Sequence, residues 1–348
     1  MAQQTLPRSV PGPTLPALTG IITPMLTPIT ETGALSPAGV KGLIEYFRGR
    51  RVINTAFVRC GMGHMYSFTV DETKAIADAA VEAAAGEIGV IVGCAGEYRR
   101  RSGERPDPQR YLEQSIELSR YVADRGAQAA VLVVPQALAP EPGRPLADTI
   151  YDYYAAVDAA VDFPLAIYHP PGLDPAYRFT PELMGRLLSL RHIRGMKLSV
   201  DTHEEWDPIT AVAATRPDFS LICGVEYFHL EALKTGAVGC IGGGGNTHPE
   251  LMFAVQDNFL AGRLAEAEKA QAAVNETRAI FAGLGHGVAG IQYMVRQGAA
   301  LEPRVRAGRG AYAGQTDRAA LYLPEVMDPL AAKLDALLRP YRQAYGII

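Results

Sequence analysis

The sequence lacks the features that mark several large classes of protein. Its 348 residues include only four cysteines, at positions 60, 94, 223 and 240, with no C-x-x-C pair, so no disulfide framework is predicted. No apolar run approaches the roughly 20 residues that span a bilayer, and the N-terminal segment has no signal pattern. The net charge of −4 excludes a basic surface for nucleic acid or for an anionic membrane. We therefore expect a cytoplasmic globular protein in which the cysteines are small buried side chains.

Short apolar runs alternate along the chain with amphipathic stretches. The apolar runs predict strands at 20–26, 54–60, 88–94, 128–134, 164–168, 193–198, 219–224 and 237–242. The amphipathic stretches predict helices at 36–50, 71–86, 108–126, 147–162, 180–191, 203–216 and 226–235, with Ser36, Asp71, Thr180 and Thr202 as capping residues. Strands without polar alternation, separated by crossover helices, indicate a parallel sheet.

Eight such units predict a (β/α)8 TIM barrel with additional C-terminal helices. An open doubly wound sheet is the alternative, but no G-x-G-x-x-G follows the first strand. We expect an N-terminal arm at 1–17, the barrel at 18–247 and a C-terminal helical region at 248–348. In that last region the patterns predict helices at 248–285, 286–300 and about 325–344, with a Gly/Arg-rich connection at 301–317.

Lysine is scarce, with six residues against 27 arginines, and one lysine stands apart. Lys197 ends the sixth apolar run, whereas the other five lie in helix patterns. Burial lowers the pKa of a lysine toward neutrality, and a neutral amine can attack a ketone to form a Schiff base. The alternatives are a buried lysine paired with a carboxylate and a strand-end lysine that extends to water. Because barrel active sites lie at the carboxyl ends of strands, Lys197 is the candidate nucleophile.

Other strand ends also carry candidate groups. Tyr168 ends the fifth run before two prolines and is either a proton shuttle or a core tyrosine. Gly61 and Gly63 permit a tight turn after the second run, with backbone N–H groups that can bind an anion. The four glycines at 242–245 leave room for a bulky ligand, donate N–H groups to a carboxylate, or form a flexible closing loop.

In this order and spacing the motifs resemble one known family. LTGIITPMLTP, the G-x-G turn, Y-x-x-P from Tyr168, G-x-K ending at Lys197, and GAVGCIGGGGN are similar to motifs of the dihydrodipicolinate synthase / N-acetylneuraminate lyase superfamily, over roughly residues 18–300. These are class I, Schiff-base aldolases. The resemblance implies that Lys197 condenses with pyruvate or another 2-oxo acid, that Tyr168 transfers protons, and that no metal or cofactor is needed beyond the covalent imine. It also implies a cytoplasmic homo-oligomer, a dimer or tetramer.

The chain departs from the family where the substrate would bind. The family turn G-T-T-G-E reads here Cys60-Gly61-Met62-Gly63-His64, so both hydroxyls are missing and only the backbone of Gly61 and Met62 is left for the carboxylate. The family's P-Y-Y is replaced by Pro-Gln-Ala at 135–137. Leu173 stands where the family has an arginine, and His169 stands where it has an asparagine after the tyrosine. These changes argue against a true dihydrodipicolinate synthase. We expect a more apolar and roomier pocket in which Gly242 and Gly243 also contact substrate, and a bulkier or less acidic partner substrate.

Several polar groups near the predicted strand ends have two interpretations each. His64 and His169 either replace the missing proton relay or are structural hydrogen-bonding residues. The basic segment 97–105 either recognises an anionic substrate or is a solvated loop or subunit contact. His203, Glu204 and Glu205 indicate a helix start and no metal site.

Two alternatives to an aldolase stay open. One is a hydro-lyase or hydratase-aldolase that uses the same imine, and the other is a non-catalytic binding barrel. Retention of both Lys197 and Tyr168 speaks against the latter.

Overall fold

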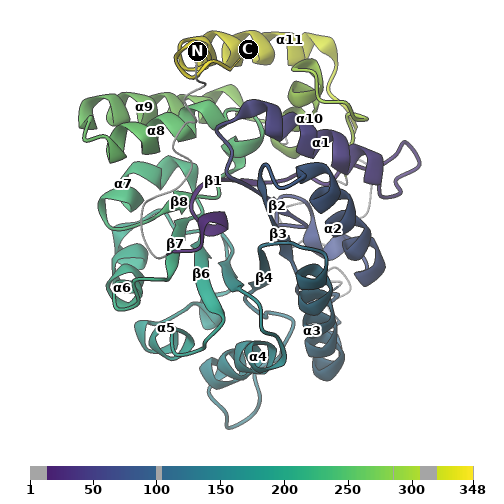
Figure 1. Cartoon of the computed structure of the whole chain (residues 1–348), viewed down its shortest axis with the longest axis vertical. Helices are drawn as coiled ribbons and strands as arrows, with labels where there is room; N and C mark the ends of the chain where they lie inside the picture. Colours follow the sequence, from purple (N-terminus) through teal and green to yellow (C-terminus); the bar gives the residue numbers. More distant parts are fainter. Residues whose placement is uncertain (1–13, 99–103, 285, 306–319, 348) are drawn as a thin grey trace.

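The computed structural model describes residues 14–98, 104–284, 286–305 and 320–347. Eight parallel strands close into a barrel in sequence order, and helices surround it (Figure 1). The strands are β1 Gly20–Pro24, β2 Thr55–Val58, β3 Gly89–Gly93, β4 Ala129–Val133, β5 Leu165–His169, β6 Ile193–Leu198, β7 Ser220–Cys223 and β8 Gly239–Cys240. Each overlaps a predicted run, so the (β/α)8 prediction is confirmed and the open-sheet alternative is wrong.

The barrel closes where β8 pairs with β1. Gly20 lies opposite Gly239, and Ile21 lies opposite Cys240. A Cβ on Gly239 would lie 2.4 Å from the carbonyl oxygen of Gly20, so a glycine is required for the two backbones to approach this closely.

The β5–β6 pair fixes which side chains face the barrel interior. Tyr168 lies opposite Lys197, and the Tyr168 ring meets that of Phe57 from β2 with centroids 6.0 Å apart. Gly195, two residues before Lys197, faces buried Leu18 of the short 3-10 helix η1 (Pro16–Leu18). Because successive side chains in a strand alternate, Tyr168 and Lys197 point inward, and their neighbours His169 and Leu198 point outward.

The barrel helices begin close to the predicted residues. They are α1 Pro37–Arg50, α2 Val70–Ala84, α3 Pro108–Asp124, α4 Leu146–Ala160, α5 Pro181–Leu187, α6 His203–Ala213 and, after the 3-10 turn η5 (Glu226–Phe228), α7 His229–Lys234. Ser36 and Thr180 cap α1 and α5 as expected. Asp71 as the cap of α2 is wrong: Thr69 caps this helix in a capping box with Glu72. Thr202 is the cap of α6 but makes no side-chain hydrogen bond.

Four further helices follow β8: α8 Pro249–Leu260, α9 Leu264–Ile280, α10 His286–Arg296 and α11 Pro324–Tyr345. The stretch 248–285 is two helices, because the chain turns back at Gly262, where φ is +73°. Helix α11 packs across α8, α9 and α10 (Figure 1). Helix α8 also contacts α7 and β1, and the expected boundary at residue 247 stays a prediction.

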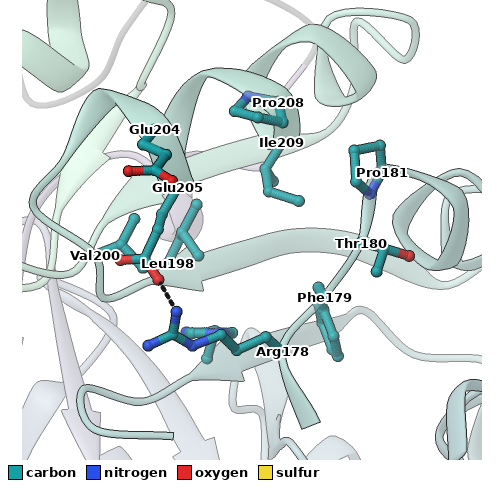
Figure 2. Close-up of a pocket in the computed structure, with 11 residues that line it drawn as sticks. Arg178, Phe179, Thr180, Pro181, Leu198, Val200, Glu204, Glu205, Pro208 and Ile209 are labelled. Atoms are coloured by element: carbon teal, nitrogen blue, oxygen red, sulfur yellow. Dashed lines mark ion pairs between the residues drawn. The ribbon is translucent and has the colours of Figure 1, made fainter. Parts of the chain in front are cut away.

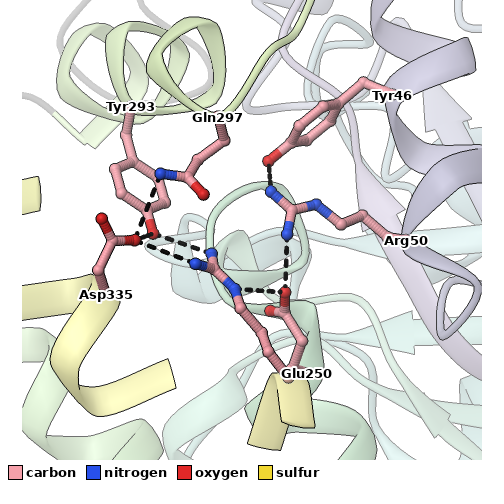
Figure 3. A network of polar contacts seen from close by, with 7 residues as sticks. Tyr46, Arg50, Glu250, Tyr293, Gln297 and Asp335 are labelled. Atoms are coloured by element: carbon pink, nitrogen blue, oxygen red, sulfur yellow. Dashed lines mark hydrogen bonds and ion pairs between the residues drawn. The ribbon is translucent and has the colours of Figure 1, made fainter. Parts of the chain in front are cut away.

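A buried polar network holds α11 to the barrel (Figure 3). Glu250 at the start of α8 is fully buried and accepts from Arg50 Nη1 at 2.9 Å and from Arg342 Nε at 3.2 Å. Arg342 also pairs with Asp335 at 3.0 Å, and Asp335 accepts from the Tyr293 hydroxyl at 2.7 Å. Helices α1, α8, α10 and α11 are thus joined by groups that would each be costly to bury alone.

No helix among the described residues is both long and apolar enough to cross a membrane. Most of the expected N-terminal arm, residues 1–13, and most of the Gly/Arg-rich connection, residues 306–319, lie outside the described residues.

Candidate active site at the carboxyl ends of the strands

Lys197 and Tyr168 form a contact pair in the barrel interior. The Nζ atom of Lys197 lies 4.5 Å from the centroid of the Tyr168 ring, and the two residues are 6% and 2% exposed. None of the ion pairs between described residues involves Lys197. The lysine therefore neither pairs with a carboxylate nor extends to water, which were the two structural alternatives.

Burial lowers the pKa of the Lys197 ammonium group, because its charged form loses hydration. The thiols of Cys60 and Cys240 and the carboxylate of Glu226 act in the opposite direction but more weakly. A lysine with a lowered pKa has a larger fraction of neutral amine at neutral pH, which is the nucleophilic form.

Three of the four cysteines lie around this lysine. Cys60, Cys223 and Cys240 are free and buried, as expected for small apolar side chains, and Cys223 lies opposite Cys240 in the β7–β8 pair. Burial raises the pKa of the Cys60 and Cys240 thiols, so both stay neutral at neutral pH. No pattern in the sequence indicated that cysteines of β7, of β8 and of the turn after β2 lie near Lys197.

The turn after β2 is closed by its own hydrogen bonds. The N–H of His64 donates to the Gly61 carbonyl at 3.1 Å, and His64 has a φ of +55°. The Gly63 N–H donates to Cys60 Sγ at 3.3 Å, and the Met62 N–H is also directed at this thiol. The Gly61 N–H makes no hydrogen bond to a described residue, so of the two expected donors it is the one available to a ligand carboxylate.

The glycine run after β8 is an ordered turn. Gly243–Asn246 forms the 3-10 helix η6, which is fastened to β1 by Thr23 Oγ1 donating to the Gly245 carbonyl and by Asn246 donating to the Pro24 carbonyl. The space beside Gly242 is filled by Glu226, and that beside Gly243 partly by Met62. The expectation that the glycines enlarge the pocket is therefore wrong at these positions, because side chains of the chain itself occupy the space.

Glu226, which sequence reasoning missed, is a buried carboxylate in this region. It follows β7, is 7% exposed, and its Oε1 accepts from the Gly244 N–H at 3.2 Å. A Cβ on Gly242 would lie 2.4 Å from its Oε2. Its charge acts on the Lys197 ammonium. The available signal was an acidic residue two positions after a predicted strand, but the pattern indicated only a helix start there.

His169 faces away from Lys197, because it follows the inward-pointing Tyr168. Its ring contacts that of Phe179 with centroids 6.0 Å apart, and its Nδ1 atom is buried without a hydrogen-bond partner. Burial lowers the pKa of His169 to about 4, so the ring is neutral at neutral pH. The structure thus separates His169 from the lysine and tyrosine, with which the sequence grouped it.

The segment after β4, where the family has two tyrosines, is held by other groups. Arg105 Nη1 donates to the carbonyls of Gln136 and Leu138 at 3.2 and 2.6 Å and to the Tyr177 hydroxyl at 2.8 Å. Of the basic segment 97–105, residues 99–103 lie outside the described residues. Leu173 is buried, at 3% exposure.

Among the described residues, no group of three or more His, Cys, Asp or Glu side chains is arranged to hold a metal ion. His203, Glu204 and Glu205 form the first turn of α6, as the sequence predicted.

Comparisons with known proteins indicate the family of this chain. Residues 17–297 match the dihydrodipicolinate synthetase family. A 4-hydroxy-tetrahydrodipicolinate synthase of Thermus thermophilus is 30% identical over 249 residues, which cover 70% of this chain and 74% of the relative. The enzyme of the same name from Protochlamydia amoebophila is 28% identical over 251 residues, which cover 72% of this chain and 77% of the relative.

Solved structures share the whole fold. A prophage protein of the dihydrodipicolinic acid synthase family from E. coli K12, in complex with pyruvate, has a TM-score of 0.75 at 22% identity. The N-acetylneuraminate lyase of Mycoplasma synoviae has a TM-score of 0.73 at 18% identity. Both alignments cover 92% of this chain and 98% of the other. With its closed barrel and its family match over most of the chain, the protein belongs to the dihydrodipicolinate synthetase family of lyases.

Proposed function

We propose that this protein is a class I lyase that cleaves or forms a carbon–carbon bond through an imine between Lys197 and pyruvate or a related 2-oxo acid. The observation that carries the proposal is the buried Lys197, which forms no ion pair with a described residue and whose Nζ lies 4.5 Å from the Tyr168 ring centroid at the carboxyl ends of β5 and β6. The pyruvate complex of the structurally similar E. coli K12 protein supports a 2-oxo acid as ligand.

The proposed steps follow from these two side chains. The neutral amine of Lys197 attacks the C2 carbonyl, and water leaves with a proton from the Tyr168 phenol, which gives a protonated imine and a Tyr168 phenolate. With a 2-oxo-4-hydroxy acid, this phenolate takes the proton of the C4 hydroxyl as the C3–C4 bond breaks and an aldehyde leaves. The electron pair of that bond moves into the imine as an enamine. Protonation at C3 and addition of water then release the 2-oxo acid and the free amine.

The test is borohydride trapping with pyruvate, followed by intact mass measurement and peptide mapping. We expect one pyruvate-sized adduct on Lys197, none on Lys197→Arg, and wild-type labelling of Lys234→Arg, a lysine of α7 paired with Glu231 at 2.9 Å. Tyr168→Phe should still form the adduct but slow proton transfer by about 10² to 10⁴-fold. An adduct that forms only with larger 2-oxo acids would mean that one of these, and not pyruvate, is the donor substrate.

The same experiment also tests the alternative that the protein is a non-catalytic binding barrel. An adduct without turnover of any 2-oxo acid would favour a non-catalytic barrel. The absence of an adduct with every 2-oxo acid tried would overturn the imine mechanism.

A second candidate, dehydration through the same imine, is favoured by Glu226. Loss of a hydroxyl group requires a proton donor for the leaving oxygen, and Glu226 is a buried carboxyl group within the electrostatic range of Lys197. Product analysis separates the two reactions, because aldol cleavage yields an aldehyde and a 2-oxo acid whereas dehydration yields one product smaller by one water.

We also propose a homo-oligomer, a dimer or tetramer. A solved structure described as the first monomeric dihydrodipicolinate synthase variant, with a TM-score of 0.72 at 18% identity and coverage of 95% of this chain and 98% of the other, supports association as the usual state of such enzymes. Sedimentation velocity measures this directly.

A further inference from the structure

A cavity lies on the outer side of β5 and β6, behind the candidate catalytic pair (Figure 2). Its volume is about 260 Å³, and it is bordered by the segment 178–181 on one side and the first turns of α6 on the other. Leu198, Val200 and Ile209 are buried apolar residues that line it. The cavity fits a small ligand with a compact apolar body.

This cavity is separate from the barrel interior. His169 and Leu198, which line it, directly follow Tyr168 and Lys197 in their strands and point to the opposite face. The pairing of Tyr168 with Lys197 continues in that of His169 with Leu198. One ladder of two strands therefore carries the candidate catalytic residues on its inner face and the cavity on its outer face.

The cavity contains a buried polar atom that has no partner among the described residues. His169 is 5% exposed, and its Nδ1 is buried without a hydrogen bond. Pro208 lies inside α6 and has no N–H, so the Glu204 carbonyl one turn earlier receives no helix hydrogen bond from it. Buried polar atoms without partners are uncommon in folded proteins and call for an explanation.

The charges in the cavity favour a cation. Arg178 forms an ion pair with Glu205, which neutralises both (Figure 2). Glu204 forms no ion pair with a described residue. His169 is neutral at neutral pH, because burial lowers its pKa to about 4. Glu204, an exposed residue, therefore contributes to the cavity edge one negative charge that no described residue pairs with.

We propose that this cavity binds a small monocationic amine, with its apolar body on Leu198, Val200 and Ile209 and its ammonium group on Glu204. His169 provides either a donor or an acceptor, according to its tautomer. Neither the family comparison nor the proposed reaction assigns a ligand to this face.

Binding here would act on the catalytic pair, a consequence that rests on the proposed function. Arg178 lies in the connection after β5, and Glu205 lies in the helix after β6. A ligand between these two segments would restrain both, and with them the strand ends that carry Tyr168 and Lys197. Binding at the cavity and imine formation would then affect each other's free energy equally.

The single tryptophan of the chain provides a local probe. Trp206 is fully buried in α6, between the cavity residues Glu205 and Pro208. We would titrate the whole protein with N,N-dimethylcyclohexylamine and record Trp206 fluorescence. This tertiary amine is cationic at neutral pH and cannot condense with a 2-oxo acid. Cyclohexanol serves as the neutral ligand of similar shape.

We expect saturable binding of the amine by the wild type and weaker binding of cyclohexanol. Glu204→Gln should weaken amine binding by about tenfold, because it removes the negative charge and keeps the shape. Glu182→Gln is the matched control, since Glu182 is exposed on α5 and does not line the cavity. No saturable change up to about 10 mM, or equal binding by Glu204→Gln, would overturn the proposal.

Tighter binding of cyclohexanol than of the amine would contradict the cationic class. Loss of amine binding together with a change in sedimentation of Glu204→Gln would assign the cavity to a subunit contact, which also overturns it.

A second arm tests the coupling. The rate of borohydride-trapped adduct formation should change by about fivefold or more when the amine is saturating in the wild type, and not in Glu204→Gln. If no adduct forms at all, the proposed function fails while the fluorescence titration still decides whether the cavity binds the amine. If the adduct forms at an unchanged rate, the site does not act on catalysis.

Discussion

At the residue scale, burial determines the chemistry of Lys197. Its ammonium group lies over the Tyr168 ring, and the lowered pKa follows mainly from lost hydration, which outweighs the opposing effects of nearby thiols and of Glu226. The unfolded chain binds more protons than the folded chain between this lowered pKa and the ordinary lysine value of about 10.4. Folding stability contributed by this residue therefore rises with pH through that window.

We predict that Lys197→Met increases the free energy of unfolding at pH 7 by about 1 to 3 kcal/mol. The gain should shrink as the pH rises toward 10, because the folded wild type then no longer has to bury a charged lysine. Urea unfolding at the two pH values measures this. The matched control is Lys234→Met, an exposed lysine paired with Glu231, which should show no pH-dependent gain. A gain that is the same at both pH values would contradict the explanation.

Glu226 is the second residue whose role depends on burial. If it supplies a proton to a leaving oxygen, Glu226→Gln should lower kcat by about 10² to 10⁴-fold and leave the borohydride adduct on Lys197 intact. The Gln side chain keeps the shape that fills the space beside Gly242. Single-turnover product formation and adduct yield are the two measurements. An unchanged kcat would mean that Glu226 has only a structural role, as acceptor of the hydrogen bond from the Gly244 N–H.

At the scale of single elements, the start of α2 shows which cap the chain uses. Thr69 Oγ1 accepts from the Glu72 N–H at 3.2 Å, and Glu72 accepts from the Thr69 N–H at 3.0 Å. The sequence pattern predicted Asp71 as the cap, and only the backbone geometry shows that Thr69 has this role.

We predict that Thr69→Ala lowers the free energy of unfolding by about 1 kcal/mol, because the Glu72 N–H at the start of α2 loses its side-chain acceptor. Thr202→Ala should change it by less than about 0.5 kcal/mol, since Thr202 makes no side-chain capping bond. Urea unfolding of both variants tests the pair. If both variants lose the same unfolding free energy, the side-chain hydrogen bond of Thr69 does not add to stability.

At the scale of the whole molecule, Glu250 connects helices that are far apart in the chain. It accepts from Arg50 of α1 and Arg342 of α11, both of which are largely buried with it. Removal of the carboxylate charge would leave two guanidinium groups without their shared partner.

We predict that Glu250→Gln lowers the free energy of unfolding by about 3 to 5 kcal/mol, the typical effect of breaking a buried ion pair from one side. Hydrogen exchange should increase first in α11, which this network joins to α1 and α8. Glu325→Gln, an exposed residue of the first turn of α11, is the control and should leave both unchanged. Exchange that increases uniformly over the barrel would contradict a local role of the network.

Local patterns in the sequence determined the eight strands, the barrel, and Lys197 and Tyr168 as strand-end candidates, because apolar runs, turn residues and family motifs are properties of neighbouring residues. Tertiary structure decided the rest. Glu226 fills the space beside Gly242, Cys223 lies opposite Cys240, and Arg342 reaches Glu250. These contacts join residues distant in the chain, and only the closed barrel with its packed helices brings them together and removes the water that would otherwise screen their charges.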